Sequence, residues 1–108
     1  MNTYEIRLTK EAEKDLRDIF KYIAVNLQAV SAAADQLGRL ENAIYNLEQM
    51  PERFHCYEKE PWHSRNLRIM PADNYLIFYI PNRENLTVTV LRIMYSARNV
   101  DKELKKIL

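Results

Sequence analysis

A change of hydrophobic period halfway along the chain limits the fold more than any other feature. Residues 75–80 are apolar throughout, which is typical of a central strand covered on both faces. Residues 86–95 are rich in β-branched side chains, and residues 67–70 place two aliphatic side chains on one side of an extended segment. With turn residues at 71–74 and 81–85, these runs predict three consecutive strands.

The first half of the chain carries the period of helices. Residues 4–8 alternate apolar and polar side chains and predict a strand, and Thr9 then fits a helix N-cap. Apolar residues next recur at helical spacing in two stripes joined near Gln28, which predicts an antiparallel hairpin that Pro51 ends. The stripes are Ala12, Leu16, Ile19, Ile23 and Leu27, then Ala33, Leu37, Leu40, Ile44 and Leu47.

A short helical pattern at 99–108 completes the order β-α-α-β-β-β-α. We therefore predict an α+β fold, with the helix hairpin packed on one face of a small, mainly antiparallel four-stranded sheet. A chain of 108 residues supports one domain, spanning residues 1–108. With only one glycine and four prolines, the composition leaves no room for a flexible linker.

Composition also narrows the functional classes. The net charge of +1 argues against strong nonspecific binding to nucleic acid, although residues 1–51 carry −2 and residues 52–108 carry +3. No apolar run is long enough to span a membrane, and no signal peptide is visible, so we expect a cytoplasmic protein without membrane contact. Because Gly38 is the only glycine, a glycine-rich phosphate loop is excluded, and we expect no cofactor.

Three residues of the 52–64 segment invite a metal interpretation, but their spacing does not support it. His55, Cys56 and His63 fit no standard zinc motif, and no second cysteine exists. We therefore expect no metal site and no disulfide within the chain. The aromatic residues of this segment are either anchors on the core or contacts for a partner, and the sequence leaves both open: Phe54, Tyr57 and Trp62.

The candidate functional surface lies at the end of the last strand. Arg92, Tyr95 and Arg98 follow one another there, and Arg68 is expected alongside from a neighbouring strand. Arginines hold phosphate oxygens, and a tyrosine stacks on bases or moves protons. If no bulge intervenes, Arg92 shares a face with Val88, Val90 and Met94, and Tyr95 lies on the opposite face. The alternative is structural, with Arg92 paired to a carboxylate and Tyr95 packed, and spacing alone favours it.

The order of these patterns resembles the RelE/ParE superfamily of toxins from type II toxin–antitoxin systems, over nearly the whole chain. The resemblance is carried by Asp15-Leu16, Phe20 and Tyr22-Ile23; by Leu47 with Pro51 and Leu67 with Pro71; by Asn74 to Tyr79; and by Leu91 to Asn99.

The details resemble the ParE-like branch, whose usual closing pair is Arg-Asp where this chain has Arg98-Asn99. The branch that cleaves mRNA tends to carry an arginine where this chain has Leu76 and often a tyrosine where it has Leu104, and it tends to be strongly basic. The resemblance thus favours a toxin that acts by binding over a ribonuclease.

The resemblance implies a bacterial toxin that inhibits growth by binding and poisoning DNA gyrase. It implies a cognate antitoxin that lies across the helices and sheet in a hetero-oligomer and neutralises the toxin. A ribosome-dependent mRNA endonuclease is the alternative, with the ribosome and mRNA as partners. In that case Arg68, Arg92 and Arg98 hold the scissile phosphate, and Tyr95 lies near the attacking hydroxyl. A third interpretation is an interaction module or a decayed toxin without activity.

Overall fold

The computed structural model describes residues 3–107, and its elements follow the predicted order. They are β1 (Glu5–Leu8), α1 (Lys10–Lys21), α2 (Val30–Tyr45), β2 (Arg68–Ala72), β3 (Tyr75–Asn82), β4 (Thr87–Tyr95) and α3 (Val100–Lys105). Within residues 3–107, no helix is long and apolar enough to cross a lipid bilayer.

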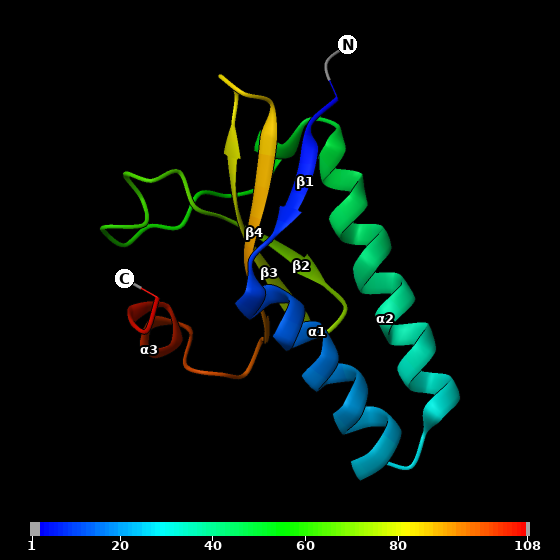
Figure 1. The fold of residues 1–108 in the computed structure, drawn as a ribbon. Helices are drawn as coiled ribbons and strands as arrows, with labels where there is room; N and C mark the ends of the chain where they lie inside the picture. Colours follow the sequence, from blue (N-terminus) through cyan, green and yellow to red (C-terminus); the bar gives the residue numbers. More distant parts are fainter. Residues whose placement is uncertain (1–2, 108) are drawn as a thin grey trace.

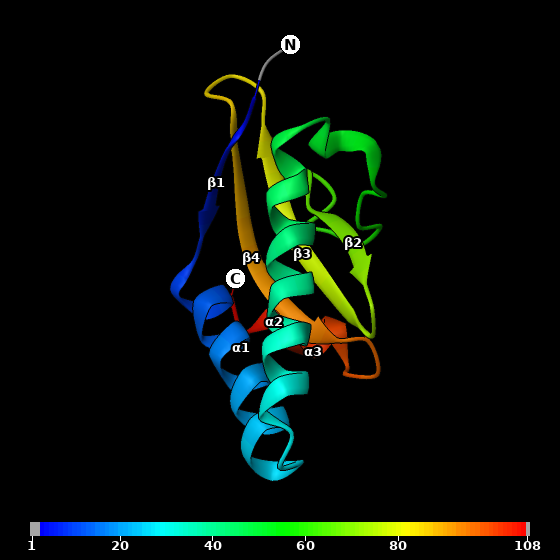
Figure 2. The ribbon, with the colours of Figure 1, turned by 90° about the vertical axis from the view of Figure 1, so that its right-hand side faces the viewer.

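The molecule has the predicted layers. Helices α1 and α2 form a hairpin on one face of the sheet, while α3 and the 57–67 segment lie against the other face (Figure 1). The side view shows the hairpin running beyond the end of the sheet at the turn between α1 and α2 (Figure 2). The α+β prediction, with a helix hairpin on a four-stranded sheet, is confirmed.

The sheet has the order β1-β4-β3-β2. Strand β1 runs parallel to β4, and the β2–β3 and β3–β4 pairs are antiparallel. The β3–β4 register shifts between Phe78 and Tyr79, because Phe78 pairs with Arg92 whereas Tyr79 pairs with Val90. Leu91 is therefore the extra residue of a β-bulge, which the sequence pattern does not predict.

The prediction that Pro51 ends the second helix is wrong. Helix α2 ends at Tyr45 and a 3₁₀ turn follows at Asn46–Glu48. Met50 then takes a left-handed conformation with φ of 47°, and Pro51 begins a second 3₁₀ turn. Proline is favoured at the first position of a helical turn because it has no amide hydrogen to leave unpaired, so here it starts a turn.

The break between the helices lies where the sequence predicts it. α1 continues as a π-helical turn over Tyr22–Asn26, and Gln28 reverses the chain with φ of 53°. Thr9 caps α1 as expected, because its Oγ1 accepts a hydrogen bond from the Ala12 backbone N–H at 3.1 Å. Leu27 is half exposed, at 56%, so the apolar stripe of α1 leaves the core at the hairpin turn.

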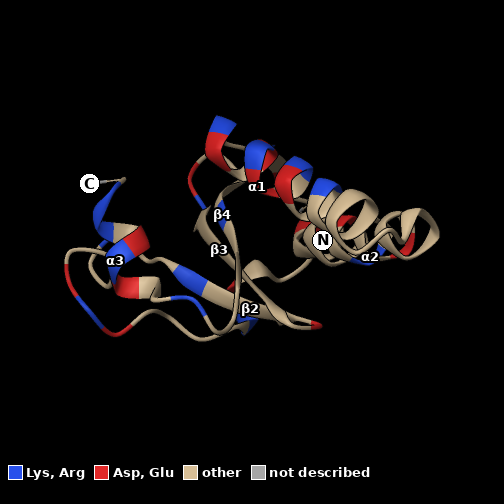
Figure 3. Ribbon diagram, turned by 90° about the horizontal axis from the view of Figure 1, so that it is seen from below, with Lys and Arg blue, Asp and Glu red and all other residues tan. Residues whose placement is uncertain are grey.

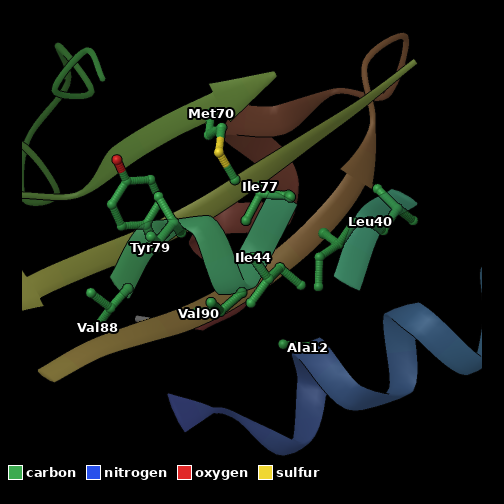
Figure 4. Close-up of a cluster of buried hydrophobic side chains, with 10 residues drawn as sticks. Ala12, Leu40, Ile44, Met70, Ile77, Tyr79, Val88 and Val90 are labelled. Carbon is green, nitrogen blue, oxygen red and sulfur yellow. The ribbon is translucent and has the colours of Figure 1, made fainter. Parts of the chain in front are cut away.

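The main core lies between the sheet and the hairpin. Figure 4 shows Tyr79, Val88 and Val90 of the strands facing Ile44 of α2 and Ala12 of α1. A second buried cluster covers the other face of the sheet. Trp62 belongs to it and is only 5% exposed, so this aromatic residue is an anchor on the core. The buried members of this cluster are Trp62, Leu67, Phe78, Met94 and Leu104.

Candidate functional site

The bulge in β4 sets which side chains reach which face. Val88, Val90 and Ile93 belong to the core under the hairpin, whereas Met94 belongs to the cluster on the other face. Arg92 pairs with Phe78 and shares the face of Met94. The expectation for Arg92 assumed that no bulge intervenes. The bulge inserts one residue between Val90 and Arg92, so Arg92 keeps the face of Met94 but not that of Val88 and Val90.

Arg92 is held inside the protein. Its Nε and Nη2 atoms donate to the two carboxylate oxygens of Asp15 on α1, at 2.7 and 3.0 Å, and both side chains are 11% exposed. This bidentate hydrogen bonding raises the pKa of Arg92, although burial opposes the effect. Glu103 of α3 lies 3.7 Å from Nη1. The structural alternative, in which Arg92 pairs with a carboxylate, describes this geometry.

Arg68 also makes its contacts within the chain. Its Nη1 donates to the backbone carbonyls of Glu52 and Phe54, at 2.7 and 2.8 Å, and its Nη2 donates to Asn66 Oδ1 at 3.0 Å. The side chain is 18% exposed and ties β2 to the segment that precedes it. These contacts leave little of the guanidinium for a ligand.

Tyr95 and Arg98 lie together at the other end of the sheet. Tyr95 is 49% exposed and contacts Tyr75 edge to face, with ring centroids 5.8 Å apart. The Arg98 backbone N–H donates to the Tyr95 carbonyl at 3.0 Å, and its side chain, 51% exposed, lies 3.4 Å from Glu103. Arg68 pairs with Tyr79, four residues along β3 from Tyr75, so about 13 Å of strand separates the two ends.

A groove of about 840 Å³ opens beside Tyr95, between the end of the sheet and the hairpin. We call it the tyrosine groove. Asn74, Tyr75, Tyr95 and Arg98 line it from the sheet side. Its remaining lining residues come from the hairpin: Tyr22, Ile23, Leu27, Ala32, Gln36 and Arg39. The floor is thus aromatic and apolar, and arginines from two sides supply the charge.

The second arginine of the groove is tied to a turn. Asp73, between β2 and β3, accepts hydrogen bonds from Arg39 Nε at 2.8 Å and from Gln36 Nε2 at 2.9 Å. These two contacts, the Arg39 bond first, lower the pKa of Asp73. Burial, followed by the proximity of Tyr95 and Tyr22, raises the pKa of Tyr75, so its hydroxyl is neutral at pH 7.

The structure therefore divides the four candidate residues. Tyr95 and Arg98 share the tyrosine groove, while Arg68 and Arg92 make contacts inside the protein. Sequence reasoning missed Asp15, which is 9% exposed and holds the end of β4. A signal was present, because Asp15 lies three residues after Ala12 and four before Ile19, within the apolar stripe of α1.

Acidic and basic residues are mixed along α1 and α3 (Figure 3). Among residues 3–107, no group of three or more His, Cys, Asp or Glu side chains is arranged to hold a metal ion. The tyrosine groove combines a cavity, exposed aromatic rings and charge.

Residues 6–100 match the sequence model of a family described as the ParE toxin of the type II toxin–antitoxin system parDE. A comparison with curated proteins finds no match.

Solved structures share the fold. A chain from the chromosomal ParDE system of P. aeruginosa matches with a TM-score of 0.70 and 17% identity, over 86% of this chain and 96% of that one. A chain of the RelBE2 toxin–antitoxin complex of Mycobacterium tuberculosis matches with 0.67 and 21%, over 91% and 97%. A mutant of the E. coli toxin RelE in the free state matches with 0.65 and 14%, over 98% and 99%.

Proposed function

The chain belongs to the ParE toxin family of type II toxin–antitoxin systems, within the RelE/ParE superfamily, and from this premise we propose that it arrests growth by binding DNA gyrase, without cutting mRNA. The observation that carries the proposal is the state of its arginines. Arg68 and Arg92 are engaged by the protein's own oxygens, and Arg98 is the half-exposed arginine of the candidate set.

Cleavage of RNA requires cations that hold the phosphate and groups that move protons. Among the described residues, the tyrosine groove is lined by no lysine, histidine or carboxylate. The raised pKa of Tyr75 keeps its hydroxyl protonated at neutral pH, far from the value that suits a general base. An aromatic groove with two arginines fits protein binding better than acid–base catalysis.

The target itself is proposed from the family. The ParE-like pattern of the closing residues implies gyrase, and the groove with the adjoining hairpin turn offers the contact surface. Four exposed apolar side chains follow one another along this turn: Tyr22, Val25, Leu27 and Val30, which are 54–65% exposed. Exposed apolar side chains grouped in this way mark protein contact sites.

We also propose a cognate antitoxin, bound in a hetero-oligomer, that covers the tyrosine groove and so competes with gyrase. Two lines support it. Chains similar to this one come from a ParDE system and from RelBE2 and RelE–RelB complexes. The groove also has the apolar floor and polar edges that an amphipathic helix requires.

The test combines growth, transcripts and purified gyrase. Induction of the chain should slow growth without new 5′ ends in translated codons, and the purified toxin should inhibit supercoiling or trap cleaved DNA. Tyr95→Ala should abolish both effects. Tyr45→Ala is the matched control, because Tyr45 is 57% exposed on α2 but lies outside the groove.

Each outcome separates the alternatives. New 5′ ends clustered in codons, with gyrase unaffected, would establish an mRNA endonuclease and overturn the proposal. Full toxicity of the Tyr95→Ala variant would remove the groove from the mechanism. Normal growth at high expression of the folded chain would identify an inactive toxin.

A further inference from the structure

Strand β4 extends beyond the end of its parallel neighbour β1. Past that point, side chains of the segment that follows β1 make hydrogen bonds to the free edge of β4. Strand β1 ends at Leu8, opposite Val90, whereas β4 continues to Tyr95. Beyond this point Thr9 Oγ1 donates to the Leu91 carbonyl at 2.9 Å, and Asp15 Oδ2 accepts from the Ile93 backbone N–H at 2.9 Å. Two polar side chains therefore replace the missing strand partners of β4.

Asp15 is the stronger of these substitutes because it holds two parts of β4 at once. Its carboxylate accepts hydrogen bonds from the Ile93 backbone N–H and from Nε and Nη2 of Arg92. Three hydrogen bonds to one buried carboxylate, two of them from a cation, fix its position more firmly than a single neutral contact. Ile93 lies two residues before Tyr95, so this clamp holds β4 about 7 Å along the strand from a residue that lines the tyrosine groove.

Helix α3 joins the same network. Glu103 accepts contacts from Arg92, Arg98 and Lys106, at 3.7, 3.4 and 3.4 Å. Although burial opposes its ionisation, the proximity of Arg98 and Lys106, together with Arg92, lowers the pKa of Glu103. The chain of contacts from Asp15 through Arg92 to Glu103 thus connects α1, the end of β4 and α3.

We propose that Asp15 is a positioning residue for the toxin's contact surface: by holding Arg92 and the Ile93 N–H, it keeps the end of β4 in the place that presents Tyr95 and Arg98 to the target. The proposal rests on the proposed role of the tyrosine groove. It assigns to Asp15 a task that a plain core ion pair does not have, because the part it holds carries the exposed aromatic and cationic side chains.

The remaining anchors of this strand end lie on its β3 side, where residues 92–95 pair with residues 75–78, and in the buried side chains of Ile93 and Met94. On the β3 side, Tyr75 pairs with Tyr95, and the Ser96 backbone N–H donates to the Asn74 carbonyl at 2.9 Å. On the other side, the Asp15 contacts stand where a strand would be. Loss of Asp15 therefore frees one edge of β4 and lets Tyr95 change its position relative to the hairpin side of the groove.

The experiment separates positioning from stability with two variants. Asp15→Leu alone leaves Arg92 as a buried charge without its partner, and we expect it to be unstable. Asp15→Leu with Arg92→Met replaces the ion pair by apolar side chains of similar size, which restores stability in many proteins. This double variant still lacks an acceptor for the Ile93 N–H. Asp18→Asn is the matched control, because Asp18 lies on the same helix in an exposed pair with Lys14.

Two readouts are measured on each variant. The first is growth arrest on induction, and the second is the ¹⁹F NMR spectrum of protein labelled with fluorotyrosine, with signals assigned by Tyr→Phe variants. In the double variant we expect a melting temperature near that of the parent, loss of growth arrest, and displaced signals of Tyr75 and Tyr95. The signal of Tyr45, on the far part of α2, should not move.

The outcomes remain distinguishable. A double variant that regains growth arrest with its stability, or whose Tyr95 signal stays in place, overturns the positioning role. If the Tyr95→Ala variant remains toxic, the proposed function of the groove fails instead, and the displacement of the Tyr95 signal still decides whether Asp15 positions it. If the double variant does not fold, Asp15→Asn serves in its place, because it keeps one acceptor oxygen for the Ile93 N–H and loses the charge and one of the two acceptors for Arg92. It should then leave the Tyr95 signal in place, and a displaced signal would overturn the role of the Ile93 contact.

Discussion

Along Thr87–Val90, β4 lies between β1 and β3, whereas from Leu91 to Tyr95 only β3 runs beside it and side chains of Thr9 and Asp15 hold the other edge. We call these the paired end and the open end. At the paired end backbone hydrogen bonds and apolar packing determine the structure. At the open end pairing with β3 and the buried Ile93 and Met94 remain, but a few polar contacts between distant residues hold the other edge, and the exposed groove lies there.

The difference between the two ends shows which part of so small a sheet has side chains free to contact a partner. The paired end is covered on both edges and faces, so its side chains have little freedom to meet a partner. The open end leaves Tyr95 and Arg98 half exposed beside an apolar groove. Stability of this end then depends on a buried ion pair, whose loss is costly because it leaves one charge without a partner.

The largest expected effect breaks the open end. Arg92→Ala should lower the free energy of unfolding by about 3 kcal/mol, because Asp15 stays buried without its cation. Urea denaturation followed by circular dichroism measures it. Lys14→Ala, which breaks an exposed pair with Asp18, should cost less than about 0.5 kcal/mol. Equal losses in both variants would contradict a structural role for the buried pair.

The next effect concerns the paired end. Val90→Ala should cost about 2 kcal/mol, because Val90 is fully buried under the hairpin and its truncation leaves a cavity. Growth arrest should persist while the variant is folded, since the groove is unchanged. Val25→Ala, at a position 62% exposed, should stay within about 0.5 kcal/mol of the parent. A Val90→Ala variant that is stable but no longer toxic would contradict the claim that only the open end contacts the target.

Alkaline pH sharpens the comparison through Tyr79, the partner of Val90. Burial raises the pKa of Tyr79 to about 12, against about 10 in the unfolded chain. As the pH rises, Tyr79 therefore loses its proton in the unfolded chain first. The contribution of Tyr79 to the free energy of unfolding is complete below pH 10 and falls by about 1.4 kcal/mol per pH unit between pH 10 and pH 12.

Unfolding free energies at pH 9 and pH 11 measure this slope as the difference between the parent and Tyr79→Phe, because burial also raises the pKa of Tyr57 to about 12. Tyr79→Phe, which has no proton to lose at this position, should show the smaller decline between the two values. A parent and a Tyr79→Phe variant with the same slope would refute the assignment.

The two ends also differ in what the sequence reveals. The strand runs, the apolar stripes and the break near Gln28 predict the fold, because alternation and helical spacing are local signals. The bulge at Leu91 was not predictable, because it depends on how β4 meets β3 and α1. The end of α2 at Tyr45 was also missed, since two 3₁₀ turns continue the chain to Arg53 with no local signal that distinguishes them from helix.

The candidate site shows the same limit. Tyr95 and Arg98 could be chosen from the closing pattern of residues, and they do lie together. Arg68 and Arg92 carry the same chemistry in the sequence, but their partners are carbonyls and a carboxylate as far as 77 residues away in the chain. Residue type predicts what a side chain can bind, whereas only the folded structure shows what it already binds.

The smallest expected effect on stability tests the comparison at two exposed arginines, one at each end of the sheet. Arg98→Ala should change the free energy of unfolding by less than about 0.5 kcal/mol, because its contact with Glu103 is half exposed. Arg83→Ala, at a position 77% exposed in the turn between β3 and β4, should change it equally little.

Their effects on growth should differ. Arg98 lines the groove and should be required for growth arrest, whereas Arg83 lies beyond the paired end and should not. Induction of both variants at matched protein levels measures this. If both lose toxicity, the protein acts through its overall charge. If both keep it, the groove binds its target through the aromatic side chains alone, and the open end owes its function to Tyr95 and its neighbours.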